Sequence, residues 1–536
     1  MSTTPHTPAP LDALIVGAGF AGLYMLHRLR QSGFNARIVE AGSGAGGTWF
    51  WNRYPGARVD IESMQYSYKF SDELAQAWNW SERYATQPEL LTYVAHVIER
   101  FNLADGIQYN TRVNRASFND ATGLWDIATS DGKTVTARHC IMATGCLSST
   151  NEPKFAGQDS FKGDTWHTGR WPKEGVDFTG KTVVVIGTGS SAIQSIPEIA
   201  KQAKRLYVLQ RTANYSVPAH NQPLDPAYVA DIKANYHDLR ERGLAQPLAY
   251  DINLNPKLAS ELSPAEIRAE LDARWAWGGL PIYGAFADLL TDARTNQIVG
   301  EYMREKIRSI VKDPATAELL CPSATFGCKR VCVDTGYYQT YNLPHVSLVD
   351  ISKIGVEEIM PTGVRAGGRT IDCDAIVFAT GFDAMTGSLD RIDIRGRGGK
   401  ALKEKWAAGP ITYLGLMSAG FPNLYTITGP GSPSVLTNMI MSIEQHVDFI
   451  TDCLEYLRAH GIAHIEARPD AELAWGDHVQ EVANGTLLYS CNSWYLGANV
   501  PGKPRVFMPY LGFPAYAEKC RQVAANGYEG FALSAA

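Results

Sequence analysis

The sequence predicts an α/β fold with two parallel-sheet units and a helical insertion in the second unit. Three observations predict this fold. A glycine-rich turn between an apolar strand and a helix occurs at residues 17–22 and again at residues 187–192. An apolar strand that ends in Ala-Thr-Gly follows each turn, at residues 140–145 and 376–381. Between the second turn and the second of these strands, the chain is rich in helix signals.

Size and charge exclude several classes of protein. At 536 residues the chain is too long for one ordinary core, and its net charge of −6 provides no basic field for nucleic acid or anionic lipid. No residue between Trp406 and Ile443 is charged, but glycines and prolines interrupt this stretch too often for a helix in a membrane. We therefore expect neither nucleic acid nor membrane as a partner, and we interpret the stretch as buried loops around a site.

The cysteines and the first residues indicate the compartment. The nine cysteines, Cys328 and Cys332 among them, form no CxxC pair and no zinc spacing, which predicts reduced thiols and no metal site. The first ten residues have neither a basic start nor an apolar run, so we interpret them as a disordered leader rather than a signal peptide. Both observations predict a cytoplasmic protein.

The first unit has the pattern of a Rossmann fold. An apolar strand at residues 11–16 leads into the turn, a helix ends near Gly33, and a strand at residues 36–39 ends in Glu40, where a carboxylate can bind ribose hydroxyls. Glycines in the turn let the backbone approach a pyrophosphate, whose charge the helix N-terminus stabilises. The pattern predicts a dinucleotide site with contacts from Gly17, Gly19, Phe20, Gly22 and Glu40.

The second unit repeats this pattern with a different end. Its order is a strand at residues 182–186, the turn, a helix from about Ser191 to Lys201 and a strand at residues 205–209. The position 23 residues after the first glycine is Glu40 in the first unit but Gln210 in the second. A carboxylate there would repel a 2′-phosphate, whereas guanidinium and hydroxyl groups would hold it. We therefore expect NADPH to contact Gly187, Thr188, Gly189, Ser190, Ser191, Arg211 and Thr212. The alternative for Arg211 is a solvated charge after a strand.

Two dinucleotide units in one chain usually pair a flavin with the nicotinamide that reduces it, so we expect FAD in the first unit and NADPH in the second. Ser263 to Glu266 forms a capping box that opens a helix ending at Trp277, which we interpret as part of an insertion that shapes the substrate entrance. The expected division is an FAD-binding domain of residues 1–148 and 386–536, an NADPH-binding domain of residues 149–218 and 334–385, and a helical insertion of residues 219–333.

Two longer motifs make the chain similar to a known family. Residues 161–172 contain Phe161, Gly163, His167, Trp171 and Pro172 in the pattern FxGxxxHxxxWP, and residues 46–60 resemble the second motif of the same family. The chain thus resembles the type I Baeyer-Villiger monooxygenases, and the likeness extends over nearly its whole length. Within the wider cyclohexanone monooxygenase family, it resembles phenylacetone and steroid monooxygenases.

The resemblance implies a flavin-dependent oxidation of ketones. NADPH reduces FAD, O₂ then forms a peroxyflavin, and its attack on the ketone carbonyl gives an ester or lactone through a Criegee intermediate; sulfides are a second substrate class. Arg330 matches the catalytic arginine of the family, and Asp60 is expected to orient it. For Arg330, the alternative is a surface arginine beside Lys329. For Asp60, the alternative is an N-cap of a helix that starts near Ile61.

The resemblance also assigns contacts with the cofactors. Lys329 is expected with Arg211 and Thr212 on the 2′-phosphate, and Trp494 on the nicotinamide side. The further FAD contacts are expected at Thr48, Trp49, Tyr66, Val113 and Met439. Aromatic core packing is the alternative for Trp49 and Tyr66.

The turn at residues 429–434 is expected to enter a helix through Val435, Leu436, Asn438 and Met439, with Ser434, Val435 and Leu436 in the wall of the substrate pocket. An ordinary junction of loop and helix is the alternative. His167 is either conformational, as in the family, or a satisfied linker histidine, and Trp171 is expected to pin the linker.

Three rival functions remain at this point. A heteroatom oxygenase would use the same flavin chemistry, but Trp171-Pro172 and Arg330 favour ketones. A pyridine-nucleotide reductase would need a redox pair, and no CxxC follows either unit. A catalytically silent flavoprotein would not need both NADPH and Arg330. The ketone itself stays open among aryl, linear, cyclic and steroid-like compounds.

Overall fold

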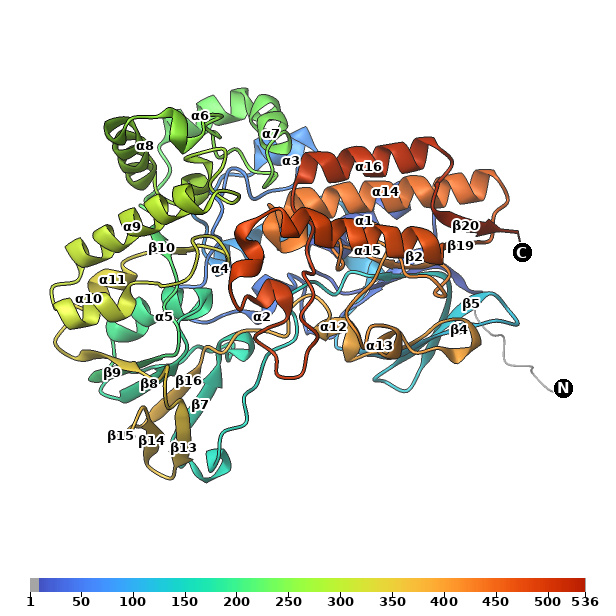
Figure 1. Cartoon of the computed structure of the whole chain (residues 1–536). Coiled ribbons are helices and arrows are strands. Elements are labelled where there is room, and N and C mark those ends of the chain that lie inside the picture. The colour runs from blue at the N-terminus through green and yellow to red at the C-terminus, as the bar shows by residue number, and fades with distance from the viewer. Residues whose placement is uncertain (1–8, 536) are drawn as a thin grey trace.

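Two separate sheets organise the molecule, a computed structural model in which residues 9–535 are described (Figure 1). The first sheet has eight strands in the order β17-β4-β5-β6-β1-β2-β3, and β18 pairs with β6. Its central strands β6, β1, β2 and β3 are parallel, whereas β4, β5 and β6 form an antiparallel meander. The strands are β1 (Leu11–Val16), β2 (Ala36–Val39), β3 (Ile107–Gln108), β4 (Val113–Asn119), β5 (Leu124–Thr129), β6 (Thr134–Met142), β17 (Asp393–Arg395) and β18 (Leu424–Thr426).

Helices from both ends of the chain cover this first sheet. Figure 1 shows α1 (Phe20–Gln31) beside α14 (Met439–Ala459), with α15 (Pro469–Asn484) and α16 (Phe513–Ala525) in the same layer. The Tyr24 hydroxyl of α1 donates a hydrogen bond of 2.7 Å to Asp448 of α14. Helices α2 (Thr48–Trp51), α3 (Asp72–Ala77) and α4 (Gln87–Arg100) complete the N-terminal part, and the strands β19 (His464–Ala467) and β20 (Phe531–Ser534) pair near the C-terminus.

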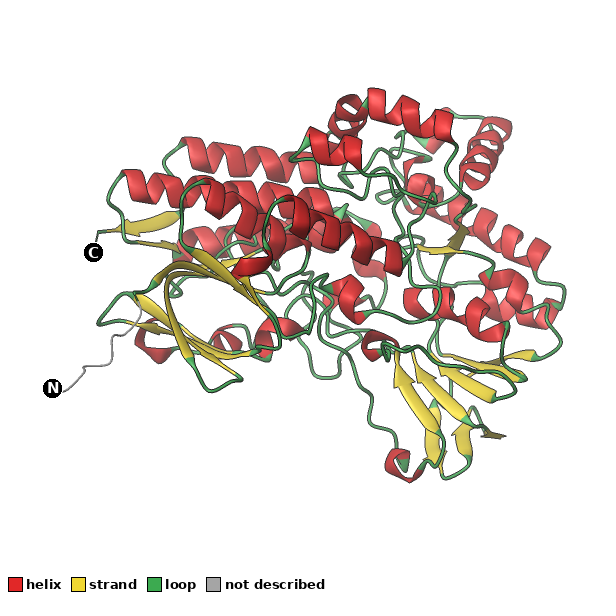
Figure 2. Cartoon of the chain, turned by 180° about the vertical axis from the view of Figure 1, so that it is seen from behind, coloured by secondary structure: helices red, strands yellow, loops and turns green. Residues whose placement is uncertain are grey.

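The second sheet has five parallel strands in the order β12-β9-β8-β16-β7. They are β7 (Asp164–His167), β8 (Thr182–Ile186), β9 (Arg205–Gln210), β12 (Val346–Asp350) and β16 (Ala375–Phe378), with α5 (Ser190–Ala200) and α11 (Tyr337–Thr340) packed beside them. An antiparallel meander of β13 (Val356–Met360), β14 (Gly363–Ala366) and β15 (Arg369–Asp372) lies next to this sheet. Seen from behind in Figure 2, the two sheets stand on opposite sides of the molecule.

The first position of each turn requires glycine for the same physical reason. Gly17 and Gly187 have positive φ angles of 108° and 116°. A Cβ atom at Gly17 would lie 2.6 Å from the carbonyl oxygen of Ala143, and one at Gly187 would lie 2.4 Å from that of Ala379. Both alanines belong to the Ala-Thr-Gly that follows β6 and β16. The expectation that these strands return across each unit is confirmed, and the return leaves no space for a side chain.

A helical region connects β10 (Ser216–Pro218) to β11 (Cys332–Asp334), which pair in parallel, so the chain leaves and re-enters side by side. Ser263 caps α8 as expected, since its hydroxyl accepts from Glu266 N and the Glu266 carboxylate accepts from Ser263 N. Gly278 ends this helix with a φ of 79°. The helices are α6 (Pro226–Ala234), α7 (Tyr236–Leu244), α8 (Pro264–Trp277), α9 (Ala293–Ile310) and α10 (Pro314–Leu320).

Two expectations from the sequence are wrong. Cys328 and Cys491 form a disulfide across 163 residues of sequence, so the cysteines are not all reduced thiols, although the other seven are free in the described chain. The helix expected through Val435 and Leu436 is a single 3-10 turn, Ser434–Leu436, and α14 begins only at Met439. The extended backbone of Thr437, with φ −120° and ψ 178°, separates the two.

The uncharged stretch between Trp406 and Ile443 is largely buried in loops around the first sheet, as expected. Across residues 9–535, every helix is too short or too polar to cross a bilayer.

Candidate active site

Arg330 and Asp60 form a bidentate ion pair. Nε and Nη2 of Arg330 donate to the two Asp60 carboxylate oxygens at 2.6 and 3.0 Å, and Nη1 donates to the Val435 carbonyl oxygen at 3.1 Å. These bonds use three of the five guanidinium N–H groups, so two remain available within the described part of the chain. Both side chains are mostly buried, with exposures of 21% and 28%. Arg330 is therefore not a surface arginine, and Asp60 does not cap a helix, since loop follows it.

The charge of Arg330 is fixed by its surroundings. Burial alone would lower the pKa of Arg330, but the charge and the hydrogen bonds of Asp60 outweigh burial, and the pKa lies above its ordinary value. Tyr495 and Tyr283 lie close enough to contribute to this balance. Tyr283 also accepts a hydrogen bond of 3.0 Å from Val331 N, and burial raises its pKa to about 12. The guanidinium group is thus charged at neutral pH.

These two tyrosines were missed by the sequence reasoning. Tyr495 directly follows Trp494, so the motif around Trp494 carried a signal for it. Tyr283 lies in a 3-10 turn of the insertion and belongs to none of the motifs, so nothing in the sequence marked it.

The loop that carries Asp60 is joined to the second unit. Tyr54 donates to the side chain of Gln194 on α5 at 2.8 Å, and Gln194 donates to the Arg58 carbonyl oxygen at 3.1 Å. Gly56 has a φ of 81°, and a Cβ atom there would lie 2.3 Å from the Gln194 carbonyl oxygen. The loop therefore places Asp60, and through it Arg330, at a constant position between the two units.

The first unit has the features of a dinucleotide site. Within the described residues, α1 has no side-chain cap at Gly19, so its first amides point outward. Gly47 approaches from the other side, since a Cβ atom at Gly19 would lie 3.3 Å from the Gly47 Cα. Glu40, at the end of β2, is buried and accepts from Ala18 N at 2.7 Å and Gly42 N at 2.6 Å. An uncapped helix end beside a fixed carboxylate fits a pyrophosphate and a ribose.

The other expected FAD contacts lie around this end of the first sheet. Trp49 donates to the Tyr66 hydroxyl at 3.2 Å, and both rings are partly buried and pack against the core of the first unit. Thr48 is exposed, Val113 is the buried first residue of β4, and Met439 is the partly buried first residue of α14.

The second unit offers open space and positive charge. Of the described atoms, none lies within 4 Å of a Cβ placed at Gly189, the uncapped start of α5. Thr188 donates to the Thr212 carbonyl oxygen at 2.9 Å, which holds the turn against the end of β9. Burial and the charge of Arg211 lower the pKa of Lys329, so the two cations lie in the same region. Neither has an acidic partner in an ion pair between residues 9 and 535, and such unpaired cations are the groups that bind a phosphate.

The serines that follow Gly189 lie at the same helix end. Ser190 is the first residue of α5, and Ser191 shares a hydrogen bond of 3.2 Å with Thr168. Thr168 directly follows His167, so this bond connects the second glycine turn to the motif at residues 161–172.

The motif at residues 161–172 lies at the edge of the second sheet. His167 ends the edge strand β7, and its Nδ1 accepts from Gly169 N at 3.0 Å, so Nε2 carries the proton and faces Thr380 at 3.2 Å. Burial lowers the pKa of His167. A Cβ atom at Gly163 would lie 2.3 Å from the Asp374 carbonyl oxygen, and Trp171 is buried against Phe178. His167 is thus a neutral, satisfied side chain, and the motif fixes the edge of the second sheet.

Of the expected pocket residues, Val435 contacts Arg330 through its backbone. Ser434 has a φ of 46°, and its hydroxyl lies 3.1 Å from Cys146 Sγ. Val435 presents its carbonyl oxygen to Arg330, and the side chains of Val435 and Leu436 are 6% and 7% exposed. Trp494, in a 3-10 turn, packs its ring 4.4 Å from that of Tyr495 and is partly exposed.

Known proteins are similar to this chain over nearly its whole length. A Baeyer-Villiger monooxygenase from Pseudooceanicola batsensis is 40% identical over 98% of this chain and 96% of its own length. The chain belongs to the Baeyer-Villiger monooxygenase family. A phenazine N-monooxygenase from Lysobacter antibioticus is 39% identical over 97% of both chains. The family model of the pyridine nucleotide-disulphide oxidoreductases matches residues 14–242.

Solved structures agree with this membership. A steroid monooxygenase bound to NADP has 51% sequence identity and a TM-score of 0.94, over 98% of this chain and all of that one. A complex of the monooxygenase OTEMO with FAD and NADP has 38% identity and a TM-score of 0.95 over the same share. The expected family and the expected fold class with two Rossmann-like units are confirmed, and the chain is a monooxygenase that acts as an oxidoreductase.

Proposed function

We propose that this Baeyer-Villiger monooxygenase converts a ketone into an ester or lactone with NADPH and O₂, with FAD along the first unit and NADPH along the second. The observation that carries the proposal is the Arg330–Asp60 pair, a fixed positive charge with two available N–H groups between the two units. Bound FAD supplies the electron carrier that NADPH reduces and that activates O₂.

The roles of the charged residues follow from this geometry. Arg330 donates hydrogen bonds to the oxygen atom on which negative charge develops, and it cannot donate a proton because its pKa is raised. Asp60 positions the guanidinium and offsets its charge. Arg211, Thr212 and Lys329 bind the 2′-phosphate of NADPH.

The remaining contacts divide between the two nucleotides and the substrate. Trp494 lies on the nicotinamide side, and the turn of Ser434, Val435 and Leu436 forms part of the substrate wall. FAD contacts Gly17, Gly19, Phe20, Gly22, Glu40, Thr48, Trp49, Tyr66, Val113 and Met439, and NADPH contacts Gly187, Thr188, Gly189, Ser190 and Ser191.

The proposed domains follow the sheets: residues 1–148 and 386–536 for FAD, residues 149–218 and 334–385 for NADPH, and residues 219–333 for the insertion. Strands β17 and β18 join the first sheet although they follow the second unit in sequence, which supports this division. We also propose that the enzyme works in the cytoplasm, because seven of its cysteines are free in the part of the chain that is described.

The test is NADPH consumption by the FAD-loaded protein with and without a panel of aryl, linear, cyclic and steroid-like ketones, with chromatographic identification of the products. Ester or lactone formed in step with ketone-stimulated NADPH oxidation is the expected result. A protein that gives no ester with any ketone, but oxidises amines or sulfides, would contradict the proposal.

Oxidation of a nitrogen atom is the second candidate activity, because a relative of almost equal identity is named a phenazine N-monooxygenase. The same assay with aromatic N-heterocycles in place of ketones separates the two activities.

A further inference from the structure

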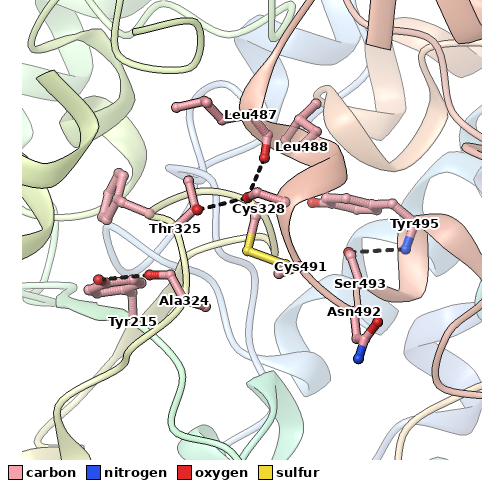
Figure 3. The surroundings of a disulfide bond; sticks show 12 residues. Tyr215, Ala324, Thr325, Cys328, Leu487, Leu488, Cys491, Asn492, Ser493 and Tyr495 are labelled. Carbon is pink, nitrogen blue, oxygen red and sulfur yellow. Dashed lines mark hydrogen bonds between the residues drawn. A yellow bond between two sulfur atoms is a disulfide. The ribbon is translucent and has the colours of Figure 1, made fainter. Parts of the chain in front are cut away.

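The disulfide joins the segment that carries Arg330 to the segment that carries Trp494 and Tyr495. Cys328 lies two residues before Arg330, and Cys491 lies three residues before Trp494 and four before Tyr495. Figure 3 shows the bond between the loop of the insertion and the C-terminal loop, with Tyr495 on the far side. The Cα atoms are 6.2 Å apart. This bond is the covalent connection between the Arg330 segment and the Trp494 segment.

The Cys328 side of the bond has a rigid base. Asn296 on α9 binds both sides of Phe326, since its amide donates to the Phe326 carbonyl oxygen at 2.9 Å and its oxygen accepts from Phe326 N at 2.9 Å. Tyr215 donates to the Ala324 carbonyl oxygen at 3.1 Å (Figure 3). Cys328 itself is buried. Its position is therefore set by the insertion, whether or not it is bonded to Cys491.

The Cys491 side belongs to a loop that combines buried side chains with separate polar contacts. We define the C-terminal loop as residues 485–508. Ser490 donates to Thr325 at 2.7 Å, and Asn499 donates to the Phe382 carbonyl oxygen at 2.7 Å. Lys503 pairs with Asp383 at 2.5 Å. Cys491 is partly exposed, and its neighbour Asn492 is exposed. Tyr495, Leu496 and Phe507 anchor the far part of this loop in the core, whereas the segment around Cys491 is more exposed, so the disulfide is the covalent connection that holds this segment.

We propose that Cys328 and Cys491 are a reversible thiol–disulfide pair that peroxide closes and dithiols open, and that the closed pair holds the C-terminal loop over the nucleotide. The partly exposed thiol of Cys491 attacks hydrogen peroxide, so that an S–O bond forms, the O–O bond breaks and one water leaves. The Cys328 thiol then displaces the second oxygen as water, which forms the S–S bond. The two sulfurs lose two electrons in total, and the peroxide gains them.

The source of the oxidant is the enzyme's own side reaction. Oxidation of NADPH by O₂ without oxygen transfer yields NADP⁺ and hydrogen peroxide beside this pair. A small-molecule dithiol reverses the reaction by exchange with the disulfide. The effect on the nucleotide rests on the proposed function, because Trp494 must lie near the nicotinamide. The redox state of the pair and the mobility of the loop do not depend on it.

The experiment compares the FAD-loaded enzyme after treatment with hydrogen peroxide and after treatment with dithiothreitol. Three quantities are measured: the cross-linked peptide of Cys328 and Cys491 by mass spectrometry, hydrogen exchange of residues 485–508, and the rate of NADP⁺ release. We expect the cross-link only after peroxide, together with slower exchange in the loop and at least threefold slower release of NADP⁺.

The variants Cys491→Ser and Cys328→Ser should give the same loop exchange and the same NADP⁺ release after both treatments. Cys321→Ser is the matched control, since Cys321 is a partly exposed free thiol in the same part of the chain, and it should behave as the unmodified enzyme. If the buried Cys328→Ser variant does not fold, the Cys491→Ser variant and the two redox states of the unmodified enzyme still test the proposal.

Absence of the cross-link after peroxide overturns the proposal, and so does a cross-link that leaves loop exchange unchanged. A cross-link that slows loop exchange but not NADP⁺ release overturns only the effect on the nucleotide. Failure of the proposed function looks different, since ketones would then give no ester in either redox state.

Discussion

At the residue scale, Arg330 is the group whose geometry is most restricted. Asp60 and the Val435 carbonyl oxygen take three of its N–H groups and leave two directed elsewhere. Arg330→Ala should keep bound FAD but lower the rate of ester formation by about 10²- to 10³-fold, since a preorganised donor to a developing oxyanion is lost. Product formation by chromatography and flavin absorbance measure the two effects.

The control for this variant is Arg308→Ala, which removes a partly exposed arginine of α9 whose ion pairs are with Glu301 and Glu318. It should leave the rate of ester formation unchanged. Ester turnover at the unmodified rate in Arg330→Ala, with full coupling to NADPH, would contradict the role of Arg330.

The lowered pKa of Lys329 predicts that the KM for NADPH, but not that for NADH, depends on pH. Burial and Arg211 lower its pKa below the ordinary value of 10.5, and only the protonated amine attracts the 2′-phosphate. The KM for NADPH should therefore rise as the pH increases through this lowered pKa, whereas the KM for NADH should not. Steady-state kinetics between pH 7 and pH 10 with both nucleotides check this.

Lys329→Arg gives the matched comparison, because a guanidinium stays charged over this whole range. The variant should lose the rise in the KM for NADPH. A parallel rise for NADH and NADPH would show that another group is responsible.

The residue scale also shows what the sequence can predict. Glu40 and Arg211 could be proposed from local sequence because each follows a strand at a set distance from a glycine turn. Arg330 and Asp60 were assigned only through the family motifs, since 270 residues separate them and local patterns carry no information about such a pair. Tyr283, without a motif, could not be found.

At the element scale, the two helix N-termini respond differently to a methyl group. Gly189 has a φ of −82°, which alanine adopts readily, and open space lies in front of it. Gly189→Ala should fold and keep FAD, but raise the KM for NADPH about tenfold or more, because the Cβ occupies the space for the pyrophosphate. NADPH kinetics and the flavin absorbance of the purified protein measure this.

Gly22→Ala should behave differently, because its Cβ atom would lie 1.9 Å from the Gly17 carbonyl oxygen and would deform the turn itself. This variant should be purified without FAD or not fold. Gly476→Ala, in α15 with ordinary contacts of 3.5 Å or more, is the neutral control. Unchanged NADPH kinetics in Gly189→Ala would place the nucleotide elsewhere.

Helix α14 carries a buried acid with consequences for stability. Glu444 accepts from Lys69 N at 2.7 Å and Phe70 N at 3.0 Å, and burial raises its pKa from 4.5 to about 7. The folded chain therefore binds more protons than the unfolded chain between these two values, so stability falls as the pH rises through this window. Glu444→Gln should remove this loss.

Relative to Glu444→Gln, the unmodified enzyme should lose about 2 to 3 kcal/mol of stability between pH 5 and pH 8. Thermal melts at both pH values measure the difference. Glu455→Gln, which changes an exposed acid on the same helix, should show no such change. Equal pH dependence in all three proteins would mean that Glu444 does not titrate in this range.

Elements were predictable where periodicity and caps coincide. The strands and helices around both glycine turns, and the capped helix α8, lie within one or two residues of their expected positions. The start of α14 was predicted too early, because the positive φ of Ser434 and the extended Thr437 depend on packing against Cys146 and other distant residues. Local sequence does not contain those contacts.

At the scale of the whole molecule, Gly56 is the contact between the Asp60 loop and α5. A Cβ atom there would press against the Gln194 carbonyl oxygen at 2.3 Å, and the φ of 81° is itself unfavourable for alanine. Gly56→Ala should keep FAD in the first unit but misplace Arg330 relative to the second unit. Fewer ester molecules per NADPH oxidised, with hydrogen peroxide in their place, is the expected result.

The ratio of ester to NADPH, together with a peroxide assay, measures this coupling. Gly175→Ala, also at a positive φ of 79° but with no described atom within 4 Å of its Cβ, controls for backbone strain alone. Equal coupling in both variants would mean that the contact with α5 does not position Arg330.

The overall arrangement was predictable only in part. Two repeated turns and two Ala-Thr-Gly strands were sufficient for the two units, because each pattern is local. The disulfide was not predictable, since 163 residues separate its cysteines and neither belongs to a short motif. Contacts of this kind depend on how the units pack, which spacing along the chain does not report.

The order of strands in the first sheet has a consequence for biosynthesis. Strands β17 and β18 and the helix α14 belong to the first unit but leave the ribosome after the second sheet is complete. The first residues of the chain form the first sheet, which therefore stays incomplete, with unpaired edges, while more than two hundred further residues are translated. The second unit can fold during this interval, and the nascent chain acquires its complete flavin site only near the end of translation.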